Sequence, residues 1–254
     1  MTNQLLNFAN EYIDFYIDGK KVKIPYCIVT QKNDTKSSYT MARTDKYSNY
    51  AGKGNTDQIK KTLLNAAKNK HFDLISRKPE EITKFMISEG IGIDCSGFVF
   101  NILDKFLRTT HHISLNRLIL RYPKILGRIE LLMFGMNRVR RSSAAILTND
   151  LNTIKIEKIK DFKLADMIRL THLDWKGKHV AIIVDIDKKY ITYAHTSEFT
   201  KNQNPHLAKI KIVNVEEDLK SQKWLEITQI GTNYGEYAFE PKRGDSVRRL
   251  KYLT

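Results

Sequence analysis

Apolar residues recur every three or four positions in four segments of the first half of the chain, and this spacing predicts helices. The segments are 3–17, 54–70, 77–90 and 94–107. The third segment carries Pro79 at a first helical position, where proline is favoured. In the fourth segment Asp94 is a good N-cap residue and places Cys95 in the first turn. The first half is therefore predicted to form helices that lead into the one bearing Cys95.

Farther along the chain the helical spacing gives way to the β-branched runs and alternation of strands. Val180 to Ile186 is one such run, a polar turn follows around Asp187, and a second run begins at Tyr190, which predicts a β-hairpin. Further strands are predicted at 208–218, 224–231 and 246–253. Helices followed by antiparallel strands are typical of an α+β fold, here with the cysteine helix packed across the sheet.

The chain has 254 residues, of which 41% are hydrophobic, and this is enough for one large core. We expect residues 1–50 to be an N-terminal extension with a helix, a strand and an exposed loop. Residues 51–254 would form the main domain, with a helical insertion at about 109–163. That insertion could be a lid, a membrane contact or a packed cap, and its role stays open.

The net charge of +15 comes from 43 basic and 28 acidic side chains. Basic residues cluster at 138–141, 155–163 and 242–251. Such a balance favours an anionic partner, such as nucleic acid, an anionic lipid surface or a cell-wall polymer. The alternative is a solvated surface without a partner, and the sequence carries no recognisable nucleic-acid-reading module.

Residues 1–15 contain Asn, Gln, Glu and Asp where a signal peptide would need an uninterrupted apolar run. No apolar run is long enough to span a bilayer. The two cysteines, Cys27 and Cys95, do not make a disulfide framework, and a free thiol suits a reducing compartment. We therefore expect a cytoplasmic protein, with export by a non-classical route left open; the sequence does not reveal the oligomeric state.

Cys95 is the first candidate for chemistry, because the positive end of a helix dipole favours a thiolate over a thiol. The alternative is a buried cysteine that only packs. The predicted hairpin places His179 opposite His195 or within two residues of it, close enough for one hydrogen bond if both share a face. A cysteine, a histidine base and a second polar group that orients the base are the parts of a cysteine hydrolase.

The stretches DCSGFV (94–99), HVAIIVDI (179–186) and YAHTS (193–197) resemble the NlpC-type family of papain-like cysteine peptidases. KLADMIRL (163–170) resembles the strand opening of that family, with Ala165 where glycine is usual. The resemblance covers about half the chain. The segment between the cysteine helix and the first strand, 109–163, is larger than in compact members, which leaves the substrate pocket undefined.

The resemblance implies a papain-like fold and a thiol protease or amidase, with peptidoglycan stem peptides as the substrate class. It implies that Cys95 is the nucleophile, His179 the base and His195 the residue that orients the base. Asp94, Ser96 and Tyr26 are the implied substrate-binding residues. Two other functions stay open: a related acyltransferase, and an inert papain-like scaffold that binds nucleic acid or another polyanion.

No metal site and no cofactor are predicted. His111 and His112 are adjacent, so their side chains diverge, and no cysteine or carboxylate cluster accompanies them. His206 lies beside Pro205 and has no predicted role.

Overall fold

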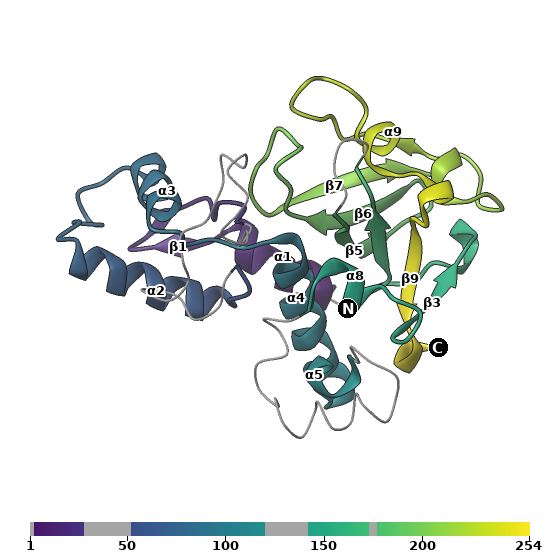
Figure 1. The fold of residues 1–254 in the computed structure, drawn as a ribbon, viewed down its shortest axis with the longest axis horizontal. Coiled ribbons are helices and arrows are strands. Elements are labelled where there is room, and N and C mark those ends of the chain that lie inside the picture. The colour runs from purple at the N-terminus through teal and green to yellow at the C-terminus, as the bar shows by residue number, and fades with distance from the viewer. Residues whose placement is uncertain (1–2, 28–51, 120–141, 173–176) are drawn as a thin grey trace.

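A computed structural model describes residues 3–27, 52–119, 142–172 and 177–254 (Figure 1). Within these residues the helices are α1 (Gln4–Ile13), α2 (Thr56–Asn69), α3 (Pro79–Ser88), α4 (Cys95–His111), α5 (Leu115–Leu118), α8 (Ala144–Leu147) and α9 (Tyr234–Ala238). The longer helices come from the first half of the chain and most strands from the second, so the fold class is α+β, as predicted.

A seven-stranded antiparallel sheet forms the second half of the molecule, in the order β3-β9-β4-β5-β6-β7-β8. Its strands are β3 (Thr153–Ile156), β4 (Met167–Leu170), β5 (His179–Ile186), β6 (Tyr190–His195), β7 (His206–Lys211), β8 (Lys223–Trp224) and β9 (Ser246–Leu250). A separate hairpin joins β1 (Tyr16–Ile17) to β2 (Lys20–Lys21). The predicted hairpin of residues 179–195 is the β5–β6 pair at the centre of the large sheet.

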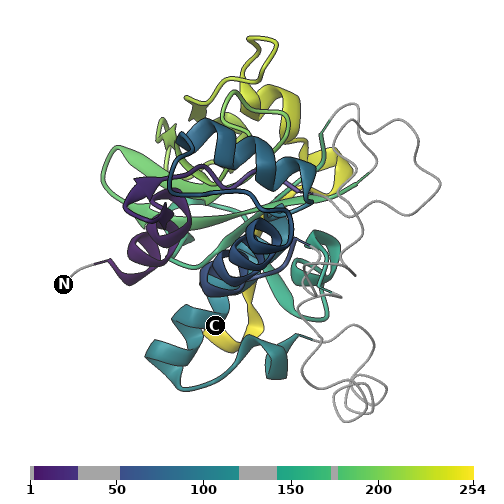
Figure 2. The ribbon, with the colours of Figure 1, turned by 90° about the vertical axis from the view of Figure 1, so that its left-hand side faces the viewer.

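Alternate side chains of β5 belong to two different cores. Val180, Ile182 and Val184 pack with the helices of the first half, whereas Ala181 and Ile183 pack with β6, β7 and α9. This alternation is what an extended strand buried on both faces requires. Figure 2 looks from the side of α2 and α3 and shows the helices in front of the sheet.

The first helix, α1, is part of the helical core. Leu5, Ala9 and Tyr12 are buried in it, and the side-chain amide of Asn3 donates to the Val184 carbonyl of β5 at 2.5 Å. The N-terminal segment predicted as an extension therefore contacts the central strand of the sheet. Residues 31–50, the predicted exposed loop, lie outside the described residues.

Several predicted boundaries were wrong. The strands predicted at 208–218 and 224–231 are shorter, because Val213, Val215 and Ile230 are exposed and have no core to face. The strand β3 lies inside the range 109–163 that was predicted to be a helical insertion, and it pairs with β9. Of that range, α5 and α8 are short helices, and 120–141 lie outside the described residues.

Candidate active site

Cys95 is the first residue of α4, as predicted, and is 5% exposed. The Gly97 N–H donates to Asp94 Oδ1 at 2.6 Å, which caps the helix. A Cβ on Gly97 would lie 2.3 Å from the Gly52 carbonyl oxygen, so only glycine allows this approach of the two backbones. The start of α4 is thus fixed by its cap and by residues 52–53.

Lys53 is a buried lysine at this helix start, and sequence reasoning missed it. Its Nζ lies 2.8 Å from Asp94 Oδ2, donates to the Ser96 hydroxyl and reaches the Ser142 carbonyl at 3.2 Å. Asp94 and Ser96, which the resemblance implied as substrate-binding residues, are therefore both engaged with Lys53. The only sequence signal was a lysine between two glycines, which alone does not indicate burial.

Tyr26 lies close to Cys95 although it is far from it in sequence. Residues 25–27 run alongside 91–93, with a parallel bridge between Tyr26 and Ile93. Burial raises the pKa of the Tyr26 phenol well above its usual value, and the nearby Cys95 and Asp94 raise it further. The hydroxyl therefore stays protonated and can act as a donor.

The thiol of Cys95 is not the thiolate that the helix start predicted. Burial, together with the nearby Asp94 carboxylate, raises its pKa to about 12. Lys53 and the backbone N–H groups of Val180 and Ser96 act in the opposite direction but do not compensate. The contact with Val180 is informative, because it brings the sulfur beside the residue that follows His179.

His179 and His195 are joined by a hydrogen bond. His179 Nε2 lies 3.1 Å from His195 Nδ1, and both rings are buried. Their strands are neighbours, and a bulge between Ile183 and Asp185 leaves both side chains on one face of the sheet. The proximity predicted from the hairpin is confirmed.

The hydrogen-bond chain continues to Glu226 and His206, which sequence reasoning did not assign. Glu226 Oε1 lies 3.1 Å from His195 Nε2 and 2.6 Å from His206 Nε2. The Tyr193 hydroxyl donates to Glu226 Oε2. Although burial opposes it, the neighbouring His195 and His206 hold the pKa of Glu226 well below its usual range, so this residue is a carboxylate.

The contacts fix the protons on the His179 and His195 imidazoles. A carboxylate beside His195 Nε2 requires a proton on that nitrogen, so His195 Nδ1 accepts from His179 Nε2. His179 Nδ1 is then left as the acceptor. This is the tautomer that a general base needs.

Aromatic rings surround His179. The ring of His172 lies 5.2 Å from that of His179 and also contacts Phe199, Tyr234 and Tyr237. Burial lowers the pKa of His172 to about 3 and holds that of His179 well below its usual value. In the resting protein these rings are therefore neutral, opposite a neutral thiol.

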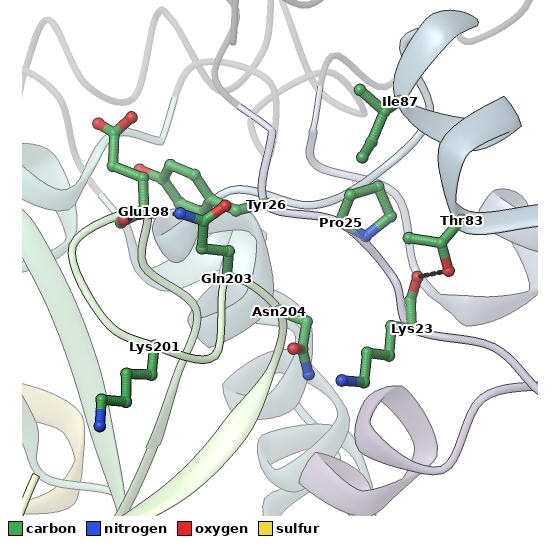
Figure 3. Close-up of a pocket in the computed structure, with 9 residues that line it drawn as sticks. All are labelled: Lys23, Pro25, Tyr26, Thr83, Ile87, Glu198, Lys201, Gln203 and Asn204. Carbon is green, nitrogen blue, oxygen red and sulfur yellow. Dashed lines mark hydrogen bonds between the residues drawn. The ribbon is translucent and has the colours of Figure 1, made fainter. Parts of the chain in front are cut away.

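A pocket of about 240 Å³ adjoins the site, with Tyr26 in its wall (Figure 3). One wall comes from residues 198–204 and the other from residues 23–25 and helix α3. Lys23, Lys201 and Glu198 give it charges of both signs. Tyr26 thus lies both in the pocket and near Cys95.

Several side chains of two of the three basic segments, 155–163 and 242–251, form ion pairs with acids of the same chain. The pairs are Lys155–Glu157, Lys158–Glu216, Lys160–Glu216, Arg248–Asp150 and Arg249–Asp166. The third segment, 138–141, lies outside the described residues. These five basic side chains are therefore less available to an external polyanion than their number suggests.

The architecture and the site define an α+β protein with a buried cysteine at a helix start and a bonded pair of histidines on the adjoining sheet. Comparison with protein-family models, with curated proteins and with solved structures found no match. Among the described helices, none has the length and apolar character that a membrane span requires.

Proposed function

We propose that this chain is a papain-like cysteine hydrolase that cleaves an amide bond, with Cys95 as nucleophile, His179 as base and His195 as the residue that orients the base. The observation that carries the proposal is the convergence of three elements. The Cys95 thiol accepts a hydrogen bond from the backbone of Val180, next to His179, while His179 is bonded to His195.

In the first step His179 Nδ1 accepts the proton of Cys95 as the sulfur attacks the carbonyl carbon. The backbone N–H of Cys95 and the Tyr26 hydroxyl are the proposed donors to the oxyanion. The C–N bond then breaks, His179 returns the proton to the leaving amine, and a thioester remains. Water hydrolyses the thioester with His179 again as base, which regenerates the thiol.

The raised pKa of Cys95 and the lowered pKa of His179 mean that the proton moves during attack instead of beforehand. This chemistry requires a correctly oriented base more than a preformed ion pair. The bond from His195, itself held by Glu226, supplies that orientation.

The family resemblance also gains support from Ala165, which stands where glycine is usual. Its φ is +71°, a conformation that glycine adopts without strain and alanine does not. The positive φ at position 165 is a physical reason why the family pattern has glycine here.

The proposed substrate class is the peptidoglycan stem peptide, cleaved between D-glutamate and the following diamino acid. Such peptides carry free carboxylates and an amine. A pocket lined by Lys23, Lys201 and Glu198 beside Tyr26 offers partners for both kinds of group.

The test is to incubate the protein with purified muropeptides and, separately, with ordinary L-peptides, and to follow the products by mass spectrometry. We expect cleavage of muropeptides by the wild type and by Cys27→Ala, and none by Cys95→Ala. Equal turnover by Cys95→Ala and the wild type would contradict the proposed cysteine hydrolase. Cleavage of L-peptides but not of muropeptides would contradict peptidoglycan as the substrate class. Transfer of the acyl group to an added amine would favour an acyltransferase.

A further inference from the structure

The cluster formed by His195, His206 and Glu226 has the composition of a transition-metal site. Two imidazole nitrogens and a carboxylate are a common ligand set for Zn²⁺, with a fourth position open. Their ligand atoms, His195 Nε2, His206 Nε2 and Glu226 Oε1, all lie within 4.8 Å of one another.

The distances are close to those of a coordinated ion. The two nitrogens are 3.1 Å apart, and they lie 3.1 and 2.6 Å from the carboxylate oxygen. Tetrahedral bonds of about 2.0 Å to zinc place ligand atoms about 3.3 Å apart, so the cluster needs to open by about 0.7 Å at most.

Each ligand also has an outer partner that orients it, as metal ligands usually do. His206 Nδ1 lies 2.7 Å from the Asn204 carbonyl oxygen, which fixes Nε2 toward the cluster. The Tyr193 hydroxyl donates to the other oxygen of Glu226, and His195 Nδ1 contacts His179.

Without a metal the cluster is crowded. The proton needed on His195 Nε2 and the proton between His206 and Glu226 both point at one carboxylate oxygen, from nitrogens only 3.1 Å apart. A cation in the centre would replace both protons and remove this conflict.

Solvent can reach the cluster from a different opening than the Tyr26 pocket. His206 and Glu226 line a separate depression of about 450 Å³ with residues 201–202, 207–209, Leu225 and Ile227. Lys201 and Lys209 are among these residues, so an anion such as hydroxide or a carboxylate is favoured as the fourth ligand.

We propose that His195, His206 and Glu226 bind one divalent transition-metal ion of the Zn²⁺ class, and that the bound ion switches the catalytic base off. The second part rests on the proposed function. A metal on His195 Nε2 forces its proton onto Nδ1, which then donates to His179 Nε2. His179 must carry its own proton on Nδ1, toward Cys95, and it can no longer accept the thiol proton. One proton is released, from the His206–Glu226 pair.

The test first measures metal binding alone, by titrating chelator-treated protein with Co²⁺ and recording its visible absorption, which is intense for tetrahedral sites. We expect one Co²⁺ per chain in the wild type and at least about a tenfold weaker affinity in His206→Ala. His71→Asn is the matched control, because His71 is exposed, has a positive φ that asparagine tolerates, and should leave binding unchanged.

The second measurement is the effect of Zn²⁺ on acyl transfer to Cys95 from p-nitrophenyl acetate. We expect inhibition of the wild type and of His71→Asn, and at least about a tenfold higher Zn²⁺ concentration for half-inhibition of His206→Ala.

Absence of Co²⁺ binding, or binding that His206→Ala leaves unchanged, would overturn the metal site. A thiolate-to-cobalt absorption band would show that the ion binds Cys95, and this result would also overturn the proposed metal site. Binding without inhibition would overturn the switch. If the metal-free protein transfers no acyl group, the proposed function fails, and the Co²⁺ titration still decides the metal site.

Discussion

Lys53 illustrates how one buried side chain supports the site without taking part in the chemistry. It is 7% exposed, and its ammonium group neutralises Asp94, the cap of the helix that begins with Cys95. Removing one partner of a buried ion pair leaves the other charge uncompensated, which costs more than the pair itself contributes.

We therefore predict that Lys53→Met lowers the free energy of unfolding by about 3 kcal/mol, measured by urea denaturation. Lys53→Met combined with Asp94→Asn should recover part of this loss, because asparagine still caps the helix and carries no charge. A loss below about 0.5 kcal/mol for the single variant would contradict the buried pair.

The thiol of Cys95 gives a prediction about pH. With its pKa raised to about 12, the reactive thiolate fraction grows as pH rises through the alkaline range. The rate of alkylation of Cys95 by iodoacetamide, followed by peptide mass spectrometry, should rise steadily from neutral pH upward without a plateau near pH 7. A plateau already reached at mildly acidic pH would show a preformed ion pair instead. Alkylation of the same cysteine in denaturant provides the reference rate.

For single residues, the sequence singled out Cys95, His179 and His195 as candidates, because a helix cap and a hairpin are local features. It could not predict Glu226 or His206, which reach the site only through the pairing of β6 with β7 and the path of the chain after β8. The expected thiolate was wrong, because burial outweighs the helix dipole once the sheet covers the helix start.

The position of α4 depends on close backbone contact at Gly97. A methyl group there would lie 2.3 Å from the Gly52 carbonyl oxygen and 2.8 Å from Lys53 Cα, and neither is a flexible side-chain end.

We predict that Gly97→Ala lowers the free energy of unfolding by about 1–3 kcal/mol and also slows acylation of Cys95, because the helix start must shift. Thermal unfolding and the acylation rate measure the two effects. Thr109→Ala, on the exposed end of the same helix, is the control and should leave acylation unaffected. Wild-type stability and rate in Gly97→Ala would contradict this account of the helix start.

Helices with wide apolar faces and clear start signals could be predicted from sequence: α2 and α4 have side-chain caps, and α3 has Pro79 at its first position. Short strands could not, because β3 and β8 hold only four and two residues and depend on long-range pairing. The exposed valines and isoleucines after β7 follow the alternation of a strand, but they do not pack against a core, so the strands predicted there were too long.

At the scale of the whole molecule, α1 links the N-terminal segment to α4, the helix that begins with Cys95. Tyr12 packs edge-on against Phe98 of α4, with ring centroids 5.2 Å apart. Burial raises the pKa of its phenol above the usual value. The folded state therefore resists ionisation of Tyr12, and the unfolded state does not.

The raised pKa of Tyr12 determines how stability changes with pH. Below pH about 10, the usual pKa of tyrosine, the contribution of Tyr12 to stability is complete. Above that pH the Tyr12 phenol ionises in the unfolded state but not in the folded state, so the free energy of unfolding falls as pH rises. Tyr12→Phe should weaken this alkaline loss, measured as the free energy of unfolding between pH 8 and 11. Tyr16→Phe, at an exposed tyrosine, is the control. An identical alkaline loss in Tyr12→Phe and wild type would contradict the prediction.

The fold class followed from the order of helical and strand patterns along the chain. The strand order did not, because β9 inserts between β3 and β4 and is the last strand in sequence. Its place is fixed by contacts such as Arg249 with Asp166, whose partners are 83 residues apart.

The central claim is that Cys95 and His179 act together as nucleophile and base. The most direct measurement is the rate at which p-nitrophenyl acetate acetylates Cys95 in metal-free protein, followed by peptide mass spectrometry in wild type and His179→Ala. We predict a thioester on Cys95 in the wild type, formed at least about 100-fold faster than in His179→Ala. Equal rates in the two proteins, or acetylation of Cys27 in place of Cys95, would contradict the account.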